Sequence, residues 1–232
     1  MSNDVILKIE GLEKTYNNRK VLYNISFPVL RGHIYALIGE NGAGKTTIMR
    51  AINGLISYKG KIELKNINGI GALIEEPALY YGLTAKENMQ AVSLMKNVSI
   101  EEDIICLANE MGILENKSKV GNFSLGMKQK MGILLALIGK PKLLILDEPL
   151  NGLDPKATIQ IRELLLKLSK QGTAILISSH MLDELFRVAT DYLFISKGRL
   201  KQSLSYDEII NKYPETSVEE IYMDILEGNH VK

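Results

Sequence analysis

A glycine-rich stretch at residues 39–47, GENGAGKTT, has the residue types and spacing of a phosphate-binding loop. It fits the pattern G-x-x-x-x-G-K-[ST], in which glycines let backbone N–H groups turn toward phosphate oxygens. The start of a helix after the loop would add partial positive charge. We expect Lys45 to reach the β- and γ-phosphates of ATP, and Thr46 to place its hydroxyl on Mg²⁺. The nucleotide-binding residues predicted from this stretch are Gly39, Asn41, Gly42, Gly44, Lys45, Thr46 and Thr47.

A pair of carboxylates in the second half of the chain supplies complementary chemistry. Asp147 and Glu148 follow four apolar residues in the stretch LLILDEP, residues 143–149. A buried strand there would present Asp147 at its carboxyl end, where open α/β sheets place their ligands. We expect Asp147 to hold the shell of a Mg²⁺ ion, and Glu148 to polarise the attacking water as a general base. The alternative is that Asp-Glu-Pro only forms a turn.

Two further carboxylates, Glu75 and Glu76, stand at the end of an apolar run in ALIEEP, residues 72–77. A carboxylate is a hard ligand that suits Mg²⁺. Glu75 is therefore a candidate metal ligand and nucleotide contact, and the alternative is a solvated strand end.

The elements that would position these groups can be predicted from hydrophobic periodicity. Alternating or continuous apolar residues indicate strands, and Gly54 ends a helix that follows the phosphate loop. Strands are expected over residues 5–16, 21–30, 33–39, 60–65 and 69–74, and the helix over residues 45–54.

The pattern becomes helical after Pro77. Thr84 with Glu87, and Ser99 with Glu102, have the spacing of capping boxes. Ser124 is a candidate N-cap. Helices are expected over residues 84–96, 99–113 and 124–139.

Strands and helices alternate again from residue 142 onward. Strands are expected over residues 142–149, 173–179 and 191–200, and helices over 155–172, 181–189 and 217–229. This order predicts one domain of residues 1–232 with an α/β core and an inserted all-helical subdomain. The core comprises residues 1–76 and 141–232, and the subdomain comprises residues 77–140.

Composition excludes several classes of protein. The net charge of +1 gives no basic field for nucleic acid, and a single cysteine, Cys106, fits a reducing compartment. The N-terminal residues lack the pattern of a signal peptide. The longest apolar run, residues 131–139, is far shorter than the roughly 20 residues of a membrane span. We expect a cytoplasmic protein, to which other chains would supply any membrane spans.

Four more segments resemble the motifs of ABC-type ATPases and occur in the order of that family. NFSLGMKQK, residues 122–130, resembles the signature motif LSGGQ, and LNGLD, residues 150–154, resembles the D-loop. ISSHMLDE, around His180, resembles the switch region, and LEKTYNN, around Tyr16, resembles the adenine-stacking loop. The whole chain is similar to nucleotide-binding subunits of ABC transporters, most of all to bacterial bacitracin-resistance and lantibiotic self-immunity exporters.

This resemblance implies a P-loop NTPase core with a β subdomain and the helical insertion, and it implies roles for individual residues. Tyr16 would stack on adenine, and His180 would bond the γ-phosphate. Ser124 and Gly126 would contact the γ-phosphate held by a second copy, and Asp154 would lie at that dimer contact. The signature motif departs from the family at Phe123, Leu125 and Met127, so that a glycine and an amide are replaced. Each role has a plainer alternative: a core aromatic, a surface histidine or a helix cap.

The resemblance also bears on Glu75, which occupies the position where the family usually has a glutamine near the Mg²⁺ and water site. The implied protein is the ATP-hydrolysing motor of an antimicrobial-peptide exporter. It would bind polytopic membrane subunits at the inner face of the membrane and form a homodimer on ATP binding. Alternatives are a soluble single-cassette ATPase, such as one for iron–sulfur assembly, and a regulatory module without turnover.

Overall fold

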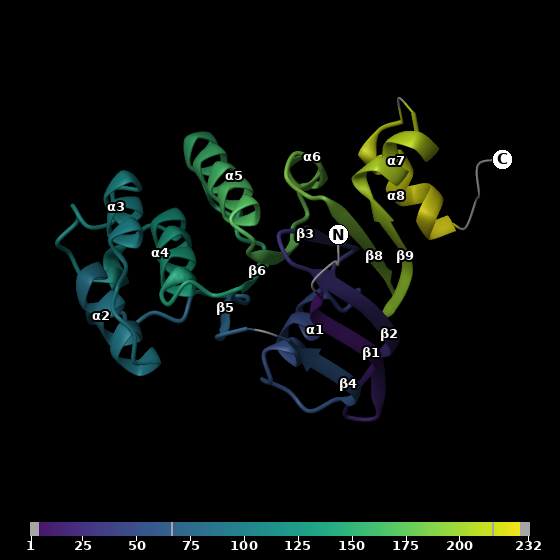
Figure 1. Cartoon of the computed structure of the whole chain (residues 1–232), viewed down its shortest axis with the longest axis horizontal. Coiled ribbons are helices and arrows are strands. Elements are labelled where there is room, and N and C mark those ends of the chain that lie inside the picture. The colour runs from purple at the N-terminus through teal and green to yellow at the C-terminus, as the bar shows by residue number, and fades with distance from the viewer. Residues whose placement is uncertain (1–4, 66, 215, 228–232) are drawn as a thin grey trace.

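The strands form two sheets of different character. The computed structural model describes residues 5–65, 67–214 and 216–227. A 3-stranded antiparallel sheet has the order β2-β1-β4, and a 6-stranded sheet has the order β5-β6-β7-β3-β8-β9, in which only β9 runs antiparallel to its neighbour (Figure 1). The strands are β1 (Val5–Tyr16), β2 (Arg19–Leu30), β3 (Ile34–Ile38), β4 (Lys59–Leu64), β5 (Ile70–Leu73), β6 (Leu143–Asp147), β7 (Ala174–Ser178), β8 (Asp191–Ser196) and β9 (Arg199–Ser205).

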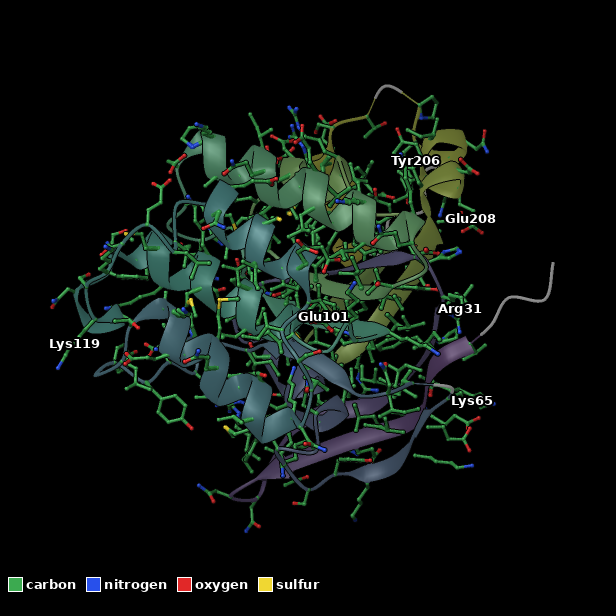
Figure 2. All side chains as sticks on the ribbon, turned by 60° about the vertical axis from the view of Figure 1, so that its left-hand side comes forward. Arg31, Lys65, Glu101, Lys119, Tyr206 and Glu208 are labelled. Carbon is green, nitrogen blue, oxygen red and sulfur yellow. The ribbon has the colours of Figure 1, made fainter. Side chains whose placement is uncertain are left out.

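Helices surround the larger sheet, and three of them project to one side. Figure 1 shows α2, α3 and α4 grouped at one end of the molecule, with α7 and α8 at the other. In Figure 2, Lys119 points outward from the first group, far from Tyr206 and Glu208 on α7. The helices are α1 (Lys45–Ile52), α2 (Ala85–Lys96), α3 (Glu102–Glu110), α4 (Leu125–Leu137), α5 (Pro155–Lys170), α6 (Leu182–Phe186), α7 (Tyr206–Lys212) and α8 (Val218–Glu227), with a 3-10 turn at Val120–Asn122.

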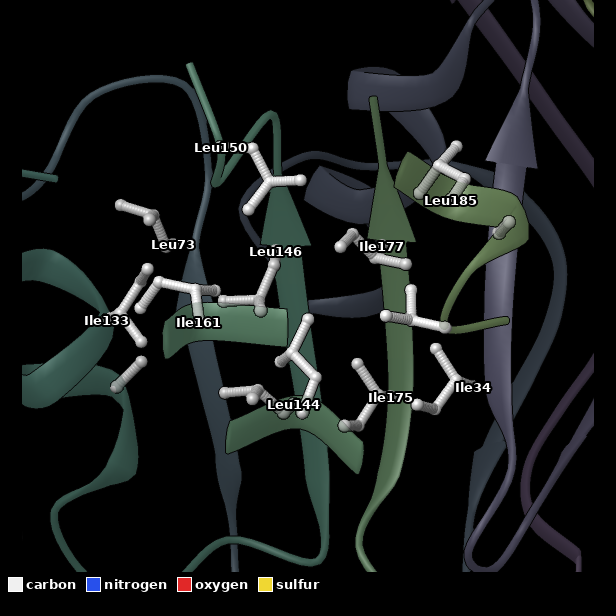
Figure 3. Packing of buried hydrophobic residues seen from close by; sticks show 14 of the residues in the cluster. Ile34, Leu73, Ile133, Leu144, Leu146, Leu150, Ile161, Ile175, Ile177 and Leu185 are labelled. Carbon is white, nitrogen blue, oxygen red and sulfur yellow. The ribbon is translucent and has the colours of Figure 1, made fainter. Parts of the chain in front are cut away.

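The central strands are buried on both faces, and this explains their continuous apolar sequences. Successive side chains of a strand point to opposite faces, so Leu144 and Leu146 of β6 join Ile175 and Ile177 of β7 on one face (Figure 3). The intervening residues of both strands belong to a second cluster that also contains β1, β2 and α1. The parallel strands therefore have a hydrophobic core on each of their two faces, and their carboxyl ends meet at one edge of the sheet.

Most of the expected elements are confirmed, with some differences at their ends. Thr84 and Glu87 form the predicted capping box, and Ser124 caps α4 by accepting from the Met127 N–H at 3.2 Å. The capping box predicted at Ser99 is wrong. Helix α3 begins at Glu102 after Glu101 and has no side-chain cap, because Ser99 lies too far ahead of the helix to reach its first free N–H groups.

The chain beyond β8 contains structure that the sequence pattern did not predict. Strand β9 completes a hairpin with β8, and α7 begins with a capping box between Ser205 and Glu208. The predicted helix over 181–189 is shortened to α6. The predicted tail helix corresponds to α8, and residues 228 and 229 lie outside the described residues.

The helical insertion packs directly on the core sheet. Helices α2, α3 and α4 all lie within residues 77–140, although the division of the chain at 76 and 141 stays a prediction. Gly71 of β5 lies so close to α4 that an added Cβ would stand 2.2 Å from the Ala136 carbonyl oxygen. No helix in residues 5–65, 67–214 and 216–227 has both the length and the apolar character needed to cross a membrane.

Replacing Gly71 by Ala should destabilise the protein by about 1–3 kcal/mol, the usual cost of overpacking. The clash is with backbone, so a side-chain rotation cannot relieve it. Urea unfolding of the variant measures this cost. The control is Gly82→Ala, because nothing lies within 4 Å of a Cβ at Gly82. Equal stability of the two variants would contradict the close seating of α4 on β5.

Candidate functional site

A cavity opens at the carboxyl ends of the parallel strands. It is bounded by the phosphate loop after β3, the turn after β5, the segment after β6 and the start of β2. Its lining residues are Arg19, Val21, Asn41, Gly42, Gly44, Lys45, Thr46, Thr47, Glu75, Glu76, Asp147, Glu148 and Asn151. The fold therefore brings the predicted phosphate loop and both predicted pairs of carboxylates to one place.

The phosphate loop folds around the ammonium group of Lys45. Gly44 precedes α1 with φ 110°, a backbone conformation that glycine adopts readily and residues with a Cβ rarely adopt. A Cβ at this position would lie 2.6 Å from the Leu22 side chain. The Lys45 ammonium donates to the carbonyl oxygens of Gly39 at 2.6 Å and Glu40 at 3.2 Å. Lys45 is buried, and this burial lowers its pKa, against the opposing effect of Glu148 and other nearby carboxylates. A bound phosphate would supply the close negative charge that the ammonium group needs.

Asp147 is held through both of its carboxylate oxygens. Oδ2 accepts from the Thr46 hydroxyl at 2.7 Å, and Oδ1 accepts from the Ser178 hydroxyl at 2.5 Å. The hydroxyl and carboxylate oxygens of Thr46 and Asp147 are hard donors that fit Mg²⁺, which binds few protein groups and completes its shell with water and phosphate. The described part of the chain has no cluster of three or more metal-binding side chains of the His, Cys, Asp and Glu types.

Glu148 is held in an unusual backbone conformation and pairs with His180. Its φ is 49°, a value that is uncommon outside glycine. Its N–H donates to the Ser178 carbonyl and hydroxyl oxygens at 3.2 and 3.0 Å, and its carbonyl oxygen accepts from Gln129 at 3.0 Å. The Glu148 carboxylate accepts from the His180 N–H at 3.2 Å and lies 2.7 Å from His180 Nδ1. The two predicted catalytic residues are therefore in contact, and the γ-phosphate contact of His180 stays a prediction.

Glu75 lines the cavity, but its carboxylate is paired with Arg50 of α1. The residue has φ 60° at the bend that follows β5. Its contact with metal or nucleotide stays a prediction.

Five residues predicted from the resemblance lie outside the cavity lining, namely Tyr16, Ser124, Gly126, Asp154 and His180. Tyr16 ends β1, and its ring is 4.6 Å from the Lys14 ammonium. Ser124 caps α4, and Gly126 lies where a Cβ would be 2.8 Å from the Gly152 carbonyl oxygen. Neither Ser124 nor Gly126 lines the cavity of the single chain, and their roles toward a second copy stay predictions.

Several residues of the site were missed from the sequence. Arg19, Val21 and Asn151 line the cavity, and Ser178 supports both Asp147 and Glu148. The position of Ser178 at the end of a predicted parallel strand was a usable signal, because such strand ends share one edge of the sheet.

Comparison with known proteins is consistent with this geometry. The family model described as ABC transporter matches residues 22–151. The lantibiotic transport ATP-binding protein SrtF of Streptococcus pyogenes is 43% identical over 211 residues, which cover 87% of this chain and 92% of that protein. The bacitracin transport ATP-binding protein BcrA of Bacillus licheniformis is 38% identical over 222 residues, which cover 88% of this chain and 71% of that protein. A solved ATP-binding subunit of an ABC transporter superposes with a TM-score of 0.86 at 30% identity, covering 95% of this chain and 99% of that one.

Replacing Lys45 by Ala should weaken ATP binding by about 10- to 150-fold, the range for losing a hydrogen bond to a charged group. Calorimetric titration measures the affinity. Lys96→Ala is the matched control, since Lys96 also donates to a backbone carbonyl, that of Ile138 at 2.9 Å, but lies outside the cavity. An unchanged affinity in Lys45→Ala would show that residues 39–47 do not hold the phosphates.

Proposed function

Because this chain belongs to the ABC transporter family, we propose that it is the ATP-hydrolysing subunit of a bacterial exporter for lantibiotic- or bacitracin-type peptides. The observation that carries the ATPase function is the meeting of Lys45, Asp147 and Glu148 around one cavity. The names of relatives such as SrtF and BcrA support the peptide class. They favour export over iron–sulfur assembly.

In the proposed reaction, the loop N–H groups and Lys45 bind the triphosphate. Thr46 and Asp147 hold Mg²⁺, which neutralises phosphate charge when bound. Glu148 takes a proton from a water whose oxygen forms a bond to the γ-phosphorus, while the bond from that phosphorus to the β–γ bridging oxygen breaks. His180 fixes the carboxylate through the contact described above and bonds the γ-phosphate once it is present.

We propose that two copies close around ATP. Ser124 and Asp154 are exposed in the single chain, and so is the apolar side chain of Leu125. Leu125 lies against Gly152, so the signature and D-loop segments form one surface. A second copy on this surface would cover Leu125 and bring Ser124 to the γ-phosphate of the facing site.

An exposed apolar surface next to the Glu75 bend is suited to the membrane subunits. Tyr80, Tyr81, Leu94 and Met95 are 48%, 51%, 81% and 73% exposed, and the Tyr80 hydroxyl contacts the Met95 sulfur at 3.5 Å. Contiguous apolar surface of this kind marks protein contacts. We place the chain at the inner face of the membrane, attached through this surface to polytopic subunits.

Replacing Glu148 by Gln should keep ATP binding, abolish turnover and trap an ATP-bound dimer. The amide keeps the shape of the side chain but cannot take a proton from water. Phosphate release and gel filtration with Mg·ATP measure the two effects. A variant that hydrolyses ATP near the wild-type rate would remove Glu148 from the role of general base.

The same variant tests the transport function in cells that also express the membrane subunits. Wild-type protein should raise resistance to a lantibiotic or bacitracin, and Glu148→Gln should not. Adding Ser124→Arg should dissolve the trapped dimer, because a long cation cannot fit at the proposed contact. Equal resistance with and without the wild-type chain would contradict the proposed export.

A further inference from the structure

Arg50 stands where α1 passes the nucleotide cavity. It lies four residues after Thr46 in the same helix, and residues with this spacing share a helix face. Its guanidinium group donates to the Glu75 carboxylate from the turn after β5. The two side chains are 36% and 51% exposed. Glu75 lines the cavity and Arg50 does not, so the pair stands on the surface beside the cavity rather than in the core.

Arg50 pairs with a group from a distant part of the sequence. Its pKa is raised, first by the hydrogen bond to Glu75 and, among smaller effects, by a contact with the Tyr16 hydroxyl. A planar guanidinium carries several N–H donors in fixed directions, so it can serve two such partners where a lysine ammonium cannot do so as well. The hydrogen bond to Glu75 thus joins the bend after β5 to α1.

Glu75 places a negative charge on the wall of the cavity, and Arg50 is the cation that pairs with it. A carboxylate on the wall of this cavity repels a triphosphate, and it could also occupy the oxygen-rich position beside Thr46 and Asp147. In the structure Glu75 bonds neither of these residues and is held by Arg50 instead. The left-handed backbone at Glu75 is a conformation that surrounding contacts must maintain.

We propose that Arg50 is a positioning residue that holds the Glu75 carboxylate on α1 and neutralises it, so that a nucleoside triphosphate can enter. The inference rests on the proposed nucleotide site and adds to it a residue that sets how strongly binding depends on Mg²⁺. Without Arg50, the Glu75 charge would face the phosphates unless a cation arrived with them.

The test is a double-mutant cycle of Arg50→Met and Glu75→Gln, read as ATP affinity by calorimetry in EDTA and again with Mg²⁺. In EDTA, Arg50→Met should weaken ATP binding by about two- to fivefold, the range for an exposed ion pair. The loss should shrink with Mg²⁺ and with added salt, since both screen the exposed charge. In EDTA, Glu75→Gln should bind ATP slightly more tightly than wild type, because it removes the carboxylate and leaves the Arg50 charge, and the double variant should return to about the wild-type affinity. Arg50→Lys should keep part of the affinity that Arg50→Met loses.

Lys140→Met is the control, because it breaks an exposed ion pair with Asp103 outside the cavity, and it should leave ATP affinity unchanged. Two results would overturn the inference. One is wild-type affinity of Arg50→Met in EDTA, and the other is an equal loss from Arg50→Met with Glu or Gln at position 75, which would mean that Arg50 acts without Glu75. If the wild-type chain fails to bind ATP at all, the proposed function itself is wrong.

Discussion

The arrangement of the site depends on the two hydrogen bonds of the Asp147 carboxylate. One comes from Thr46 at the start of α1 and the other from Ser178 at the end of β7. Asp147 is only 4% exposed, and a buried carboxylate without such partners would be costly. These bonds fix the distance between the phosphate loop and the strands on which the carboxylates stand. Ser178 also holds the backbone of Glu148, so one serine sets the position of both acidic residues.

Three charged side chains of the site are bonded to other groups of the protein. Lys45 is bonded to loop carbonyls, Glu148 contacts His180, and Glu75 contacts Arg50. The contacts of Lys45 and Glu148 support the proposed Mg·ATP site, since a bound phosphate and its water would offer both groups further partners.

The features that the sequence could predict are local. The phosphate loop, its helix and the strand before Asp147 follow from apolar runs and a fixed spacing of glycines, and both strand and helix lie where expected. The strand-end position of Ser178 gave a usable signal, because β6 and β7 are neighbours in the sheet and place Ser178 opposite Asp147. The Arg50–Glu75 contact joins α1 to the bend after β5 and could not be predicted from such patterns. The error at Ser99 has a different cause, because capping-box spacing alone does not decide where a helix begins. The assignment of Tyr16 to adenine rests on resemblance, and the cavity lining does not include it.

In the proposed function, Asp147 and its partners form a metal-dependent ATP site. The most direct measurement compares wild type with Asp147→Asn for ATP affinity with and without Mg²⁺, and for phosphate release. Wild type should bind ATP more tightly with Mg²⁺ and release phosphate. The Asn variant should still bind ATP in EDTA, but it should lose both the gain from Mg²⁺ and the phosphate release. Phosphate release by Asp147→Asn at the wild-type rate would show that Asp147 and its partners are not the metal-dependent ATP site.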